Sequence, residues 1–210
     1  MSLYLDSANL DDVREAANLG FVRGATTNPK LLANAGHTDF YKAMEEICPL
    51  LPGTVFYQLI TESLDEMRQE YRVFRSVAPN LGIKIPCTLT GLQFAKEISR
   101  ESIVALTAVF SPAQAYLAGE AGARFVIPFV NRYTRLTGSG EELVSDIAIV
   151  LQGSRCQVLA ASVKSAREAV GILQAGAQHI SLPLAVIKEM SESPFTRTAI
   201  EEFNQALKGL

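Results

Sequence analysis

The sequence has few of the residues that hold metal ions or form disulfides, and it has no segment that could cross a membrane. Three cysteines and two histidines occur among 210 residues, and they form neither a Cys-x-x-Cys pair nor a cluster with carboxylates. This speaks against a metal centre and a disulfide-stabilised secreted fold. No apolar run reaches the roughly 18 residues that span a bilayer, and the N-terminus does not resemble a signal peptide. We therefore expect a soluble, cytoplasmic protein without a metal.

The charge pattern excludes further classes of partner. The formal net charge is -3, and lysine and arginine do not gather in any block. Binding to nucleic acid or to an anionic membrane surface is therefore not expected, whereas small or phosphorylated solutes remain as partners. A hydrophobic content of 48% with 20% charged residues is ordinary for one well-buried core. We expect a single domain over residues 1–210.

Short apolar runs alternate with helical stretches along the whole chain. The eight runs are residues 3–7, 21–29, 54–59, 82–86, 103–109, 124–130, 156–162 and 179–183. Eight strand-plus-helix units of this size predict a (β/α)8 TIM barrel. A doubly wound open sheet is the rival, but the first run lacks the glycine-rich phosphate turn that often follows strand one there. Residues 194–208 predict an additional C-terminal helix, which either caps the barrel or packs on a neighbouring subunit.

One lysine lies inside a run that otherwise predicts a buried strand. Lys84 stands between two isoleucines in "GIKIP". Because neighbouring strand residues point to opposite faces, isoleucines that face the helices turn Lys84 into the barrel. The same alternation turns Asp6, Gln58 and Thr107 inward, each in the later part of its strand. That end of the barrel is where enzymes of this fold keep their active sites.

These four side chains support two readings. Apolar walls lower the pKa of a lysine, and a neutral amine can form a Schiff base with a ketone, with Asp6 as general acid and base. Alternatively, Lys84 and Asp6 form a buried structural ion pair, and Gln58 and Thr107 are satisfied core polar groups. The pattern alone leaves both readings open.

Several segments resemble the transaldolase family, specifically its short branch of small transaldolases and fructose-6-phosphate aldolase. The segments are "LYLDSANL", "GATTNPKLL", "IKIPCTLTGL", "ALTAVFSPAQAYLAGEAGA", "IPFVNR" and "LAASVKS", in the same order from residue 3 to about 190. The resemblance implies a barrel that forms a Schiff base with a ketose phosphate and uses no metal or organic cofactor. It also implies a ring-shaped homo-oligomer, a pentamer or a decamer.

The resemblance assigns a role to each of the four inward residues. It implies that Lys84 is the Schiff-base lysine and that Asp6 is the proton-transfer acid. It further implies that Thr107 orders a catalytic water, with Gln58 as the second partner of that water.

The resemblance also implies a set of substrate-binding residues. Thr26 and Asn28 match residues that hold the hydroxyl groups of the three-carbon donor fragment. Arg132 and Ser162 match the phosphate clamp, with Lys164 where longer transaldolases tend to carry an arginine. A lysine acts as a point charge rather than a bidentate fork, so we expect a looser clamp.

Two positions separate the family's two activities, and they point in different directions. Phe129 stands where the aldolase branch has a proton-transferring tyrosine, which favours transfer of dihydroxyacetone between sugar phosphates. Gln58 instead matches the aldolase branch. We expect a transaldolase of the pentose phosphate pathway, with fructose-6-phosphate aldolase as the alternative. A phosphate-binding isomerase barrel and a non-catalytic scaffold are the further alternatives.

Overall fold

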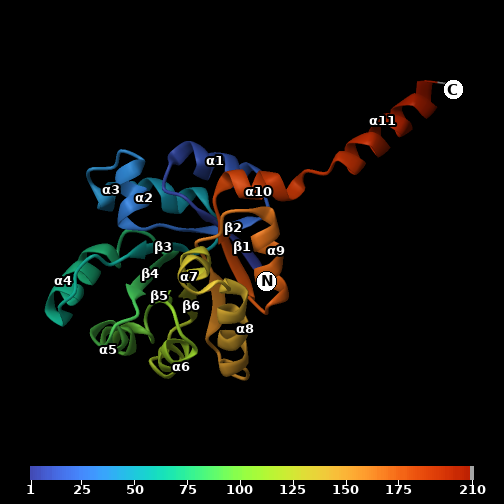
Figure 1. The fold of residues 1–210 in the computed structure, drawn as a ribbon. Coiled ribbons are helices and arrows are strands. Elements are labelled where there is room, and N and C mark those ends of the chain that lie inside the picture. The colour runs from blue at the N-terminus through green and yellow to red at the C-terminus, as the bar shows by residue number, and fades with distance from the viewer. Residues whose placement is uncertain (209–210) are drawn as a thin grey trace.

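Eight parallel strands close into a barrel in the computed structural model of the chain, which describes residues 1–208 (Figure 1). The strands are β1 (Ser2–Asp6), β2 (Val22–Thr26), β3 (Val55–Gln58), β4 (Leu81–Pro86), β5 (Val104–Val109), β6 (Phe125–Pro128), β7 (Gln157–Ala160) and β8 (His179–Leu182). Each overlaps a predicted apolar run, with β1 and β4 beginning one residue earlier than predicted, so the (β/α)8 barrel is confirmed and the open sheet is wrong. The last two residues of the predicted domain, 209 and 210, lie outside the described residues.

Helices follow the strands around the outside of the ring. They are α1 (Leu10–Asn18), α2 (Pro29–Asn34), α3 (Phe40–Ile47), η1 (Cys48–Leu50), α4 (Leu64–Phe74), α5 (Leu89–Ile98), α6 (Pro112–Glu120), α7 (Val130–Thr137), α8 (Gly140–Val150), α9 (Ala166–Gln174), α10 (Leu184–Ser191) and α11 (Pro194–Lys208). Short polar segments set their starts. Ser63, Ser139 and Ser165 each accept a hydrogen bond from the backbone N–H of the glutamate three residues later, which is typical of helix N-caps.

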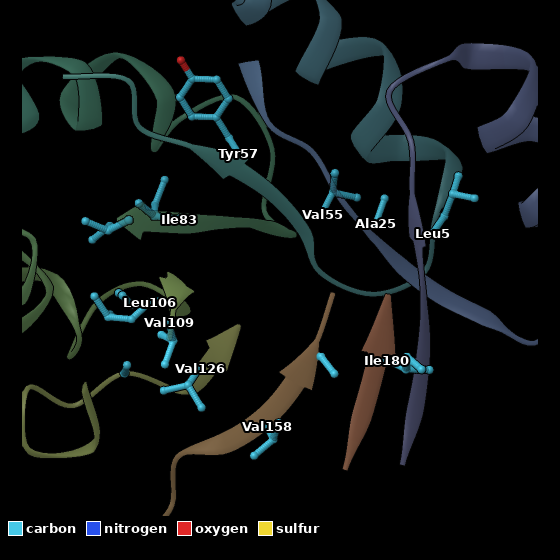
Figure 2. Packing of buried hydrophobic residues seen from close by; sticks show 14 of the residues in the cluster. Leu5, Ala25, Val55, Tyr57, Ile83, Leu106, Val109, Val126, Val158 and Ile180 are labelled. Carbon is cyan, nitrogen blue, oxygen red and sulfur yellow. The ribbon is translucent and has the colours of Figure 1, made fainter. Parts of the chain in front are cut away.

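The strands separate two layers of buried side chains. One layer faces the helices and includes Leu5, Val55, Ile83 and Leu106 (Figure 2). The other fills the barrel interior and consists of Tyr4, Phe56, Ala105, Phe125, Ile127, Leu159 and Ala161. Burying one large aliphatic side chain contributes about 1.5–3 kcal/mol to folding stability. This energy determines which face of each strand points toward the helices. The predicted inward direction of Lys84 follows from this, because its two neighbouring isoleucines lie in the helix-facing layer.

The ladder between β5 and β6 is irregular directly after Thr107. The register skips from Thr107 to Val109, and the intervening Ala108 has a φ of 56°. A left-handed alanine costs about 1–2 kcal/mol, so packing on both sides must hold it. The extra residue returns Val109 to the helix-facing layer beside Leu106 (Figure 2) while Thr107 remains fully buried.

The C-terminal helix does not cap the barrel. Figure 1 shows α11 extending away from the body of the molecule. Its large apolar side chains are exposed, from 51% for Ile200 to 85% for Phe195, with Phe203 and Leu207 between them. The first of the two predicted positions for this helix is therefore wrong.

The described residues contain neither a membrane-spanning helix nor a cluster of metal ligands. Among residues 1–208, no helix combines the length and apolar character needed to cross a membrane. Within the same range, no three His, Cys, Asp or Glu side chains are placed to hold a metal ion.

Candidate active site

The amine of Lys84 is the most buried charged group in the barrel. The residue is 2% exposed, and its Nζ donates a hydrogen bond to the carbonyl oxygen of Thr27 at 3.0 Å. Burial lowers the pKa of Lys84 from 10.5 to about 8, and the negative charge of Asp6 offsets part of this effect. A pKa of about 8 leaves roughly a tenth of the amine neutral, and so nucleophilic, at pH 7.

Asp6 is held by a chain of hydroxyl groups that crosses the seam of the barrel. Its carboxylate accepts a hydrogen bond from Thr26 Oγ1 at 2.9 Å, and that oxygen lies 2.7 Å from Ser181 Oγ. Because Thr26 has one hydroxyl proton, Ser181 donates to Thr26 whenever Thr26 donates to Asp6. Burial raises the pKa of Asp6, and Lys84, the Thr26 hydrogen bond and Lys164 oppose that rise. Ser181 was not among the predicted site residues, although alternation along 179–183 turns it inward between Ile180 and Leu182.

Lys84 and Asp6 do not form a direct ion pair. In the described part of the chain, the ion pairs join other residues. Lys84 instead bonds a neutral carbonyl, and Asp6 bonds a hydroxyl. The buried structural pair, which needs its two charges to satisfy each other, is therefore wrong for this site.

A cavity of about 460 Å³ opens above the lysine, at the carboxyl ends of the strands. Seven of the ten predicted site residues line it: Asp6, Asn28, Lys84, Phe129, Arg132, Ser162 and Lys164. The lining also contains residues that the sequence analysis did not single out: Lys30, Leu31, Asn34, Arg135 and Ala161. The structure thus brings one reactive amine, one acid and several cations to a single opening, as enzymes of this fold do.

Three predicted site residues lie outside this lining. Thr26 is fully buried beneath the cavity, where its hydroxyl contacts Asp6 and Ser181. Thr107 is also fully buried, and its Oγ1 has no hydrogen-bond partner among residues 1–208. Gln58 lies in register with Lys84 but lines a neighbouring cavity of about 650 Å³. An unpartnered buried hydroxyl can bond a small polar molecule.

The loop after β7 has strained backbone at the cavity wall. Ser162 has a φ of 61°, a left-handed conformation that costs about 1–2 kcal/mol outside glycine. The N–H of Asn131 donates to the Ser162 carbonyl at 2.8 Å, which ties this loop to the first turn of α7. Glu168 adds a second tie, since its carboxylate accepts from the Lys164 N–H at 2.7 Å and from the Asn131 amide at 3.3 Å. These contacts fix the backbone around Ser162 and Lys164 relative to α7.

Phe129 forms an aromatic wall at the start of α7. Its ring meets the ring of Phe110 edge-on, with centroids 6.0 Å apart. The guanidinium of Arg132 lies over the same ring, 4.9 Å from its centroid. This cation–π contact holds the guanidinium by the cavity without using any of its N–H donors.

Comparison with known proteins points to one family. The family model described as Transaldolase/Fructose-6-phosphate aldolase matches residues 3–210. A relative named "Probable transaldolase" from Symbiobacterium thermophilum is 36% identical over 206 residues, covering 97% of this chain and 95% of the relative. A protein of the same name from Clostridium perfringens is 35% identical over 213 residues, covering 98% and 99%.

Similarity to solved structures supports the fold alone. A crystal structure of mandelate oxidase with (S)-2-phenylpropionate superposes with a TM-score of 0.63 at 15% identity. The alignment covers 88% of this chain, and the chain spans 64% of the length of that protein.

Proposed function

The chain belongs to the transaldolase/fructose-6-phosphate aldolase family, and on this basis we propose that it transfers dihydroxyacetone between sugar phosphates through a Schiff base on Lys84. The donor is sedoheptulose 7-phosphate or fructose 6-phosphate, and the acceptor is glyceraldehyde 3-phosphate or erythrose 4-phosphate. These are reactions of the non-oxidative pentose phosphate pathway. The observation that carries the proposal is the buried Lys84 amine, with a pKa of about 8, in one cavity with an acid and several cations.

The proposed reaction begins with attack of neutral Lys84 on the ketose carbonyl. Loss of water gives an iminium ion, and Asp6 takes the proton of the C4 hydroxyl as the C3–C4 bond breaks. The bonding electrons move to the iminium nitrogen, which leaves an enamine on Lys84 and releases an aldose phosphate. Addition of the enamine to a second aldose phosphate reverses these steps and returns the proton from Asp6. Carbon is exchanged without oxidation or reduction.

The substrate-binding roles follow the lining of the cavity. Arg132 and Lys164 supply positive charge for the phosphate, and Ser162 supplies a hydroxyl donor. Asn28 lines the cavity and can bind a donor hydroxyl, although its side-chain oxygen also accepts the Leu31 N–H at 3.0 Å. For Thr26 we propose that its hydroxyl positions Asp6 and does not bind substrate directly, because it already donates a hydrogen bond to Asp6.

A catalytic water bound by Thr107 and Gln58 remains part of the proposal. The free hydroxyl of buried Thr107 supports it, since among the described residues that oxygen has no other partner. Gln58 lines the adjoining cavity, so the water would have to lie between the two.

Reductive trapping tests the central step. The protein is treated with borohydride in the presence of fructose 6-phosphate, and the modified peptide is mapped by mass spectrometry. We expect a covalent adduct on Lys84, none in Lys84→Met, and an unchanged adduct in the control Lys96→Met, which alters an exposed lysine of α5. Absence of any adduct would favour the isomerase alternative, in which Lys84 only stabilises charge.

The alternative activity is cleavage of fructose 6-phosphate by the same lysine. Phe129 favours transfer, because the phenyl ring in the cavity wall has no hydroxyl with which to protonate the enamine. With fructose 6-phosphate alone, we expect little release of dihydroxyacetone, and once erythrose 4-phosphate is added we expect the dihydroxyacetone unit to appear in sedoheptulose 7-phosphate. Phe129→Tyr is expected to raise cleavage relative to transfer, and an unchanged ratio would argue against this role.

We also propose that the protein is a homo-oligomer, a pentamer or a decamer. The apolar face of α11 supports this, because Phe195, Ile200, Phe203 and Leu207 are exposed on a helix that extends from the barrel (Figure 1). Sedimentation of the full chain is expected to show a ring-sized particle, and removal of residues 194–210 to reduce its size. A monomer at micromolar concentration would contradict the proposal.

The cysteines support a cytoplasmic location. Cys48, Cys87 and Cys156 are free and buried. Thiols persist in reducing compartments, so we propose the cytoplasm as the site of action. Cell fractionation checks this, and recovery outside the cytoplasmic fraction would contradict it.

A further inference from the structure

The carboxylate of Glu70, in α4, accepts hydrogen bonds from three residues around the end of β3. The Tyr57 hydroxyl donates to its Oε1 at 2.8 Å, and the Thr61 hydroxyl donates to its Oε2 at 2.8 Å. The backbone N–H groups of Ile60 and Thr61 donate to the same carboxylate at 3.2 Å. These donors lie on both sides of Gln58, the last residue of β3. Glu70 therefore holds the chain before and after Gln58.

The charge of Glu70 is directed at this segment and not at a cation. In the described part of the chain, the ion pairs of α4 are those of Arg68 with Asp65 and Glu97, and Glu70 belongs to none. Burial and Glu70 both raise the pKa of Tyr57, so its hydroxyl keeps the proton that it donates. Hydrogen bonds to an ionised carboxylate are about twice as strong as those between neutral groups.

The segment needs such an anchor because it leaves the strand ladder after Gln58. The Leu59 N–H still donates to the carbonyl oxygen of Lys84, at 2.9 Å. The next two N–H groups, of Ile60 and Thr61, bond to Glu70 and not to a strand. Buried or partly buried N–H groups require an acceptor, so the path of the chain here depends on where α4 places this carboxylate.

The direction of the Gln58 side chain depends on the backbone around it. Gln58 lies in register with Lys84 and lines the cavity of about 650 Å³. Its amide forms no hydrogen bond with another of residues 1–208, so no side-chain contact of this kind orients it. The hydroxyl of Thr107, the other partner of the proposed water, also has no partner among those residues.

We propose that Glu70 is a positioning residue, which holds the end of β3 so that the Gln58 amide is oriented to bind the water proposed beside Thr107. This rests on the proposed function, in which that water takes part, and it gives a role to a helix residue outside the lining of the Lys84 cavity. Displacing a reacting group by about 1 Å can lower a rate about a hundredfold. Because the bond from Leu59 to Lys84 remains, we expect loss of Glu70 to lower the rate by about tenfold.

The rate of Schiff-base formation tests the proposal. The full chain is mixed with fructose 6-phosphate, and borohydride is added at successive times to give both the rate and the final amount of the Lys84 adduct. We expect Gln58→Ala and Glu70→Ala each to slow the reaction about tenfold, with the final amount unchanged. The double variant should also be about tenfold slower, because Glu70 acts through Gln58 and the two losses do not multiply.

Two further variants complete the design. Thr61→Val removes one contact of Glu70 and keeps the shape of the side chain, so we expect about threefold slowing that disappears when Gln58→Ala is also present. It provides the same test if Glu70→Ala does not fold. The matched control is Glu66→Ala, since Glu66 is exposed one turn earlier in α4 and accepts a hydrogen bond from Ser63 Oγ at 2.6 Å. The control should leave the rate unchanged.

The outcomes separate a positioning role from a purely structural one. Losses that multiply to about a hundredfold in the double variant would overturn the proposal. So would an unchanged rate in Gln58→Ala, equal slowing in Glu66→Ala, or a smaller final amount of adduct formed at an unchanged rate. Absence of the adduct in the unsubstituted protein would overturn the proposed function as well, whereas a normal adduct with losses that multiply would overturn the role of Glu70 alone.

Discussion

Replacing Lys84 by methionine should make the protein more stable than the unsubstituted protein at neutral pH and less stable than it at high pH. In the folded chain the pKa of Lys84 is about 8, against an ordinary value of 10.5. Each factor of ten in proton affinity corresponds to about 1.4 kcal/mol, so keeping the buried amine protonated lowers the free energy of unfolding by about 3 kcal/mol at pH 7. Methionine has a similar length and no charge, so it removes this cost.

The substitution also has a cost of its own. Lys84 Nζ is a hydrogen-bond donor to the Thr27 carbonyl, and leaving that buried oxygen without its donor costs about 1–3 kcal/mol. The net gain at pH 7 is therefore about 0–2 kcal/mol. The change with pH does not depend on this offset, because the Thr27 carbonyl does not titrate.

The direction of the pH effect follows from proton counts. Below pH 8 the lysine is protonated in both the folded and the unfolded chain, so the full cost is present. Between pH 8 and 10.5 the unfolded chain binds more protons than the folded chain, and the unfolding free energy of the unsubstituted protein rises with pH. Above 10.5 both states are neutral and the cost is gone. The advantage of Lys84→Met should thus fall by about 3 kcal/mol between pH 7 and 10.5 and change sign.

Urea denaturation followed by circular dichroism at several pH values measures this difference, at one fixed protomer concentration. Lys42→Met is the control, because the Lys42 side chain is 73% exposed and its ion pair with Asp39 is long, at 3.9 Å. It should change stability by less than about 0.5 kcal/mol at every pH. A pH-dependent change below about 1 kcal/mol for Lys84→Met, or one of opposite sign, would show that the Lys84 amine is solvated and refute the reasoning.

Three further predictions concern the active site. The yield of borohydride adduct with fructose 6-phosphate should rise with pH and level off above about 8, the pKa of Lys84, and a flat profile would contradict the titration of that amine. Ser181→Ala weakens the hydroxyl chain that supports ionised Asp6, so the acid limb of the kcat/KM profile should move to higher pH, and an unmoved limb would leave Ser181 with a packing role only. Glu168→Ala should raise KM for fructose 6-phosphate several-fold with little change in kcat, and Glu168→Gln should restore part of it, since the contacts of Glu168 position the Lys164 backbone. Equal losses in kcat and kcat/KM would instead place Glu168 in the chemical step.

The inward-facing residues could be predicted because strand alternation has a fixed period of two. Two isoleucines in the helix-facing layer leave Lys84 no other direction, and the same logic places Asp6. Applied to the last strand it would also have found Ser181. The bulge at Ala108 and the left-handed Ser162 could not be predicted this way, because both depend on contacts with neighbouring strands and loops.

Residues on the helices around the mouth were harder to predict. Lys30 and Arg135 lie beyond the ends of their strands, where alternation no longer applies and where an exposed cation is ordinary on a helix. The separation of Gln58 from the main cavity likewise depends on the shapes of several loops. The amphipathic pattern of residues 194–208 predicted a helix but not its direction, since few contacts with the barrel fix it.

In the proposed mechanism, the hydroxyl chain at Asp6 links catalysis to completion of the fold. Asp6 comes from β1, Thr26 from β2 and Ser181 from β8, so the two ends of the barrel sequence meet at the proposed catalytic acid. A partly folded or nascent chain that lacks its final strand has the lysine but not the arrangement that orients its proton partner. Under the proposed mechanism such a chain does not orient the acid that serves the enamine, so turnover is expected to report how many molecules have closed their ring.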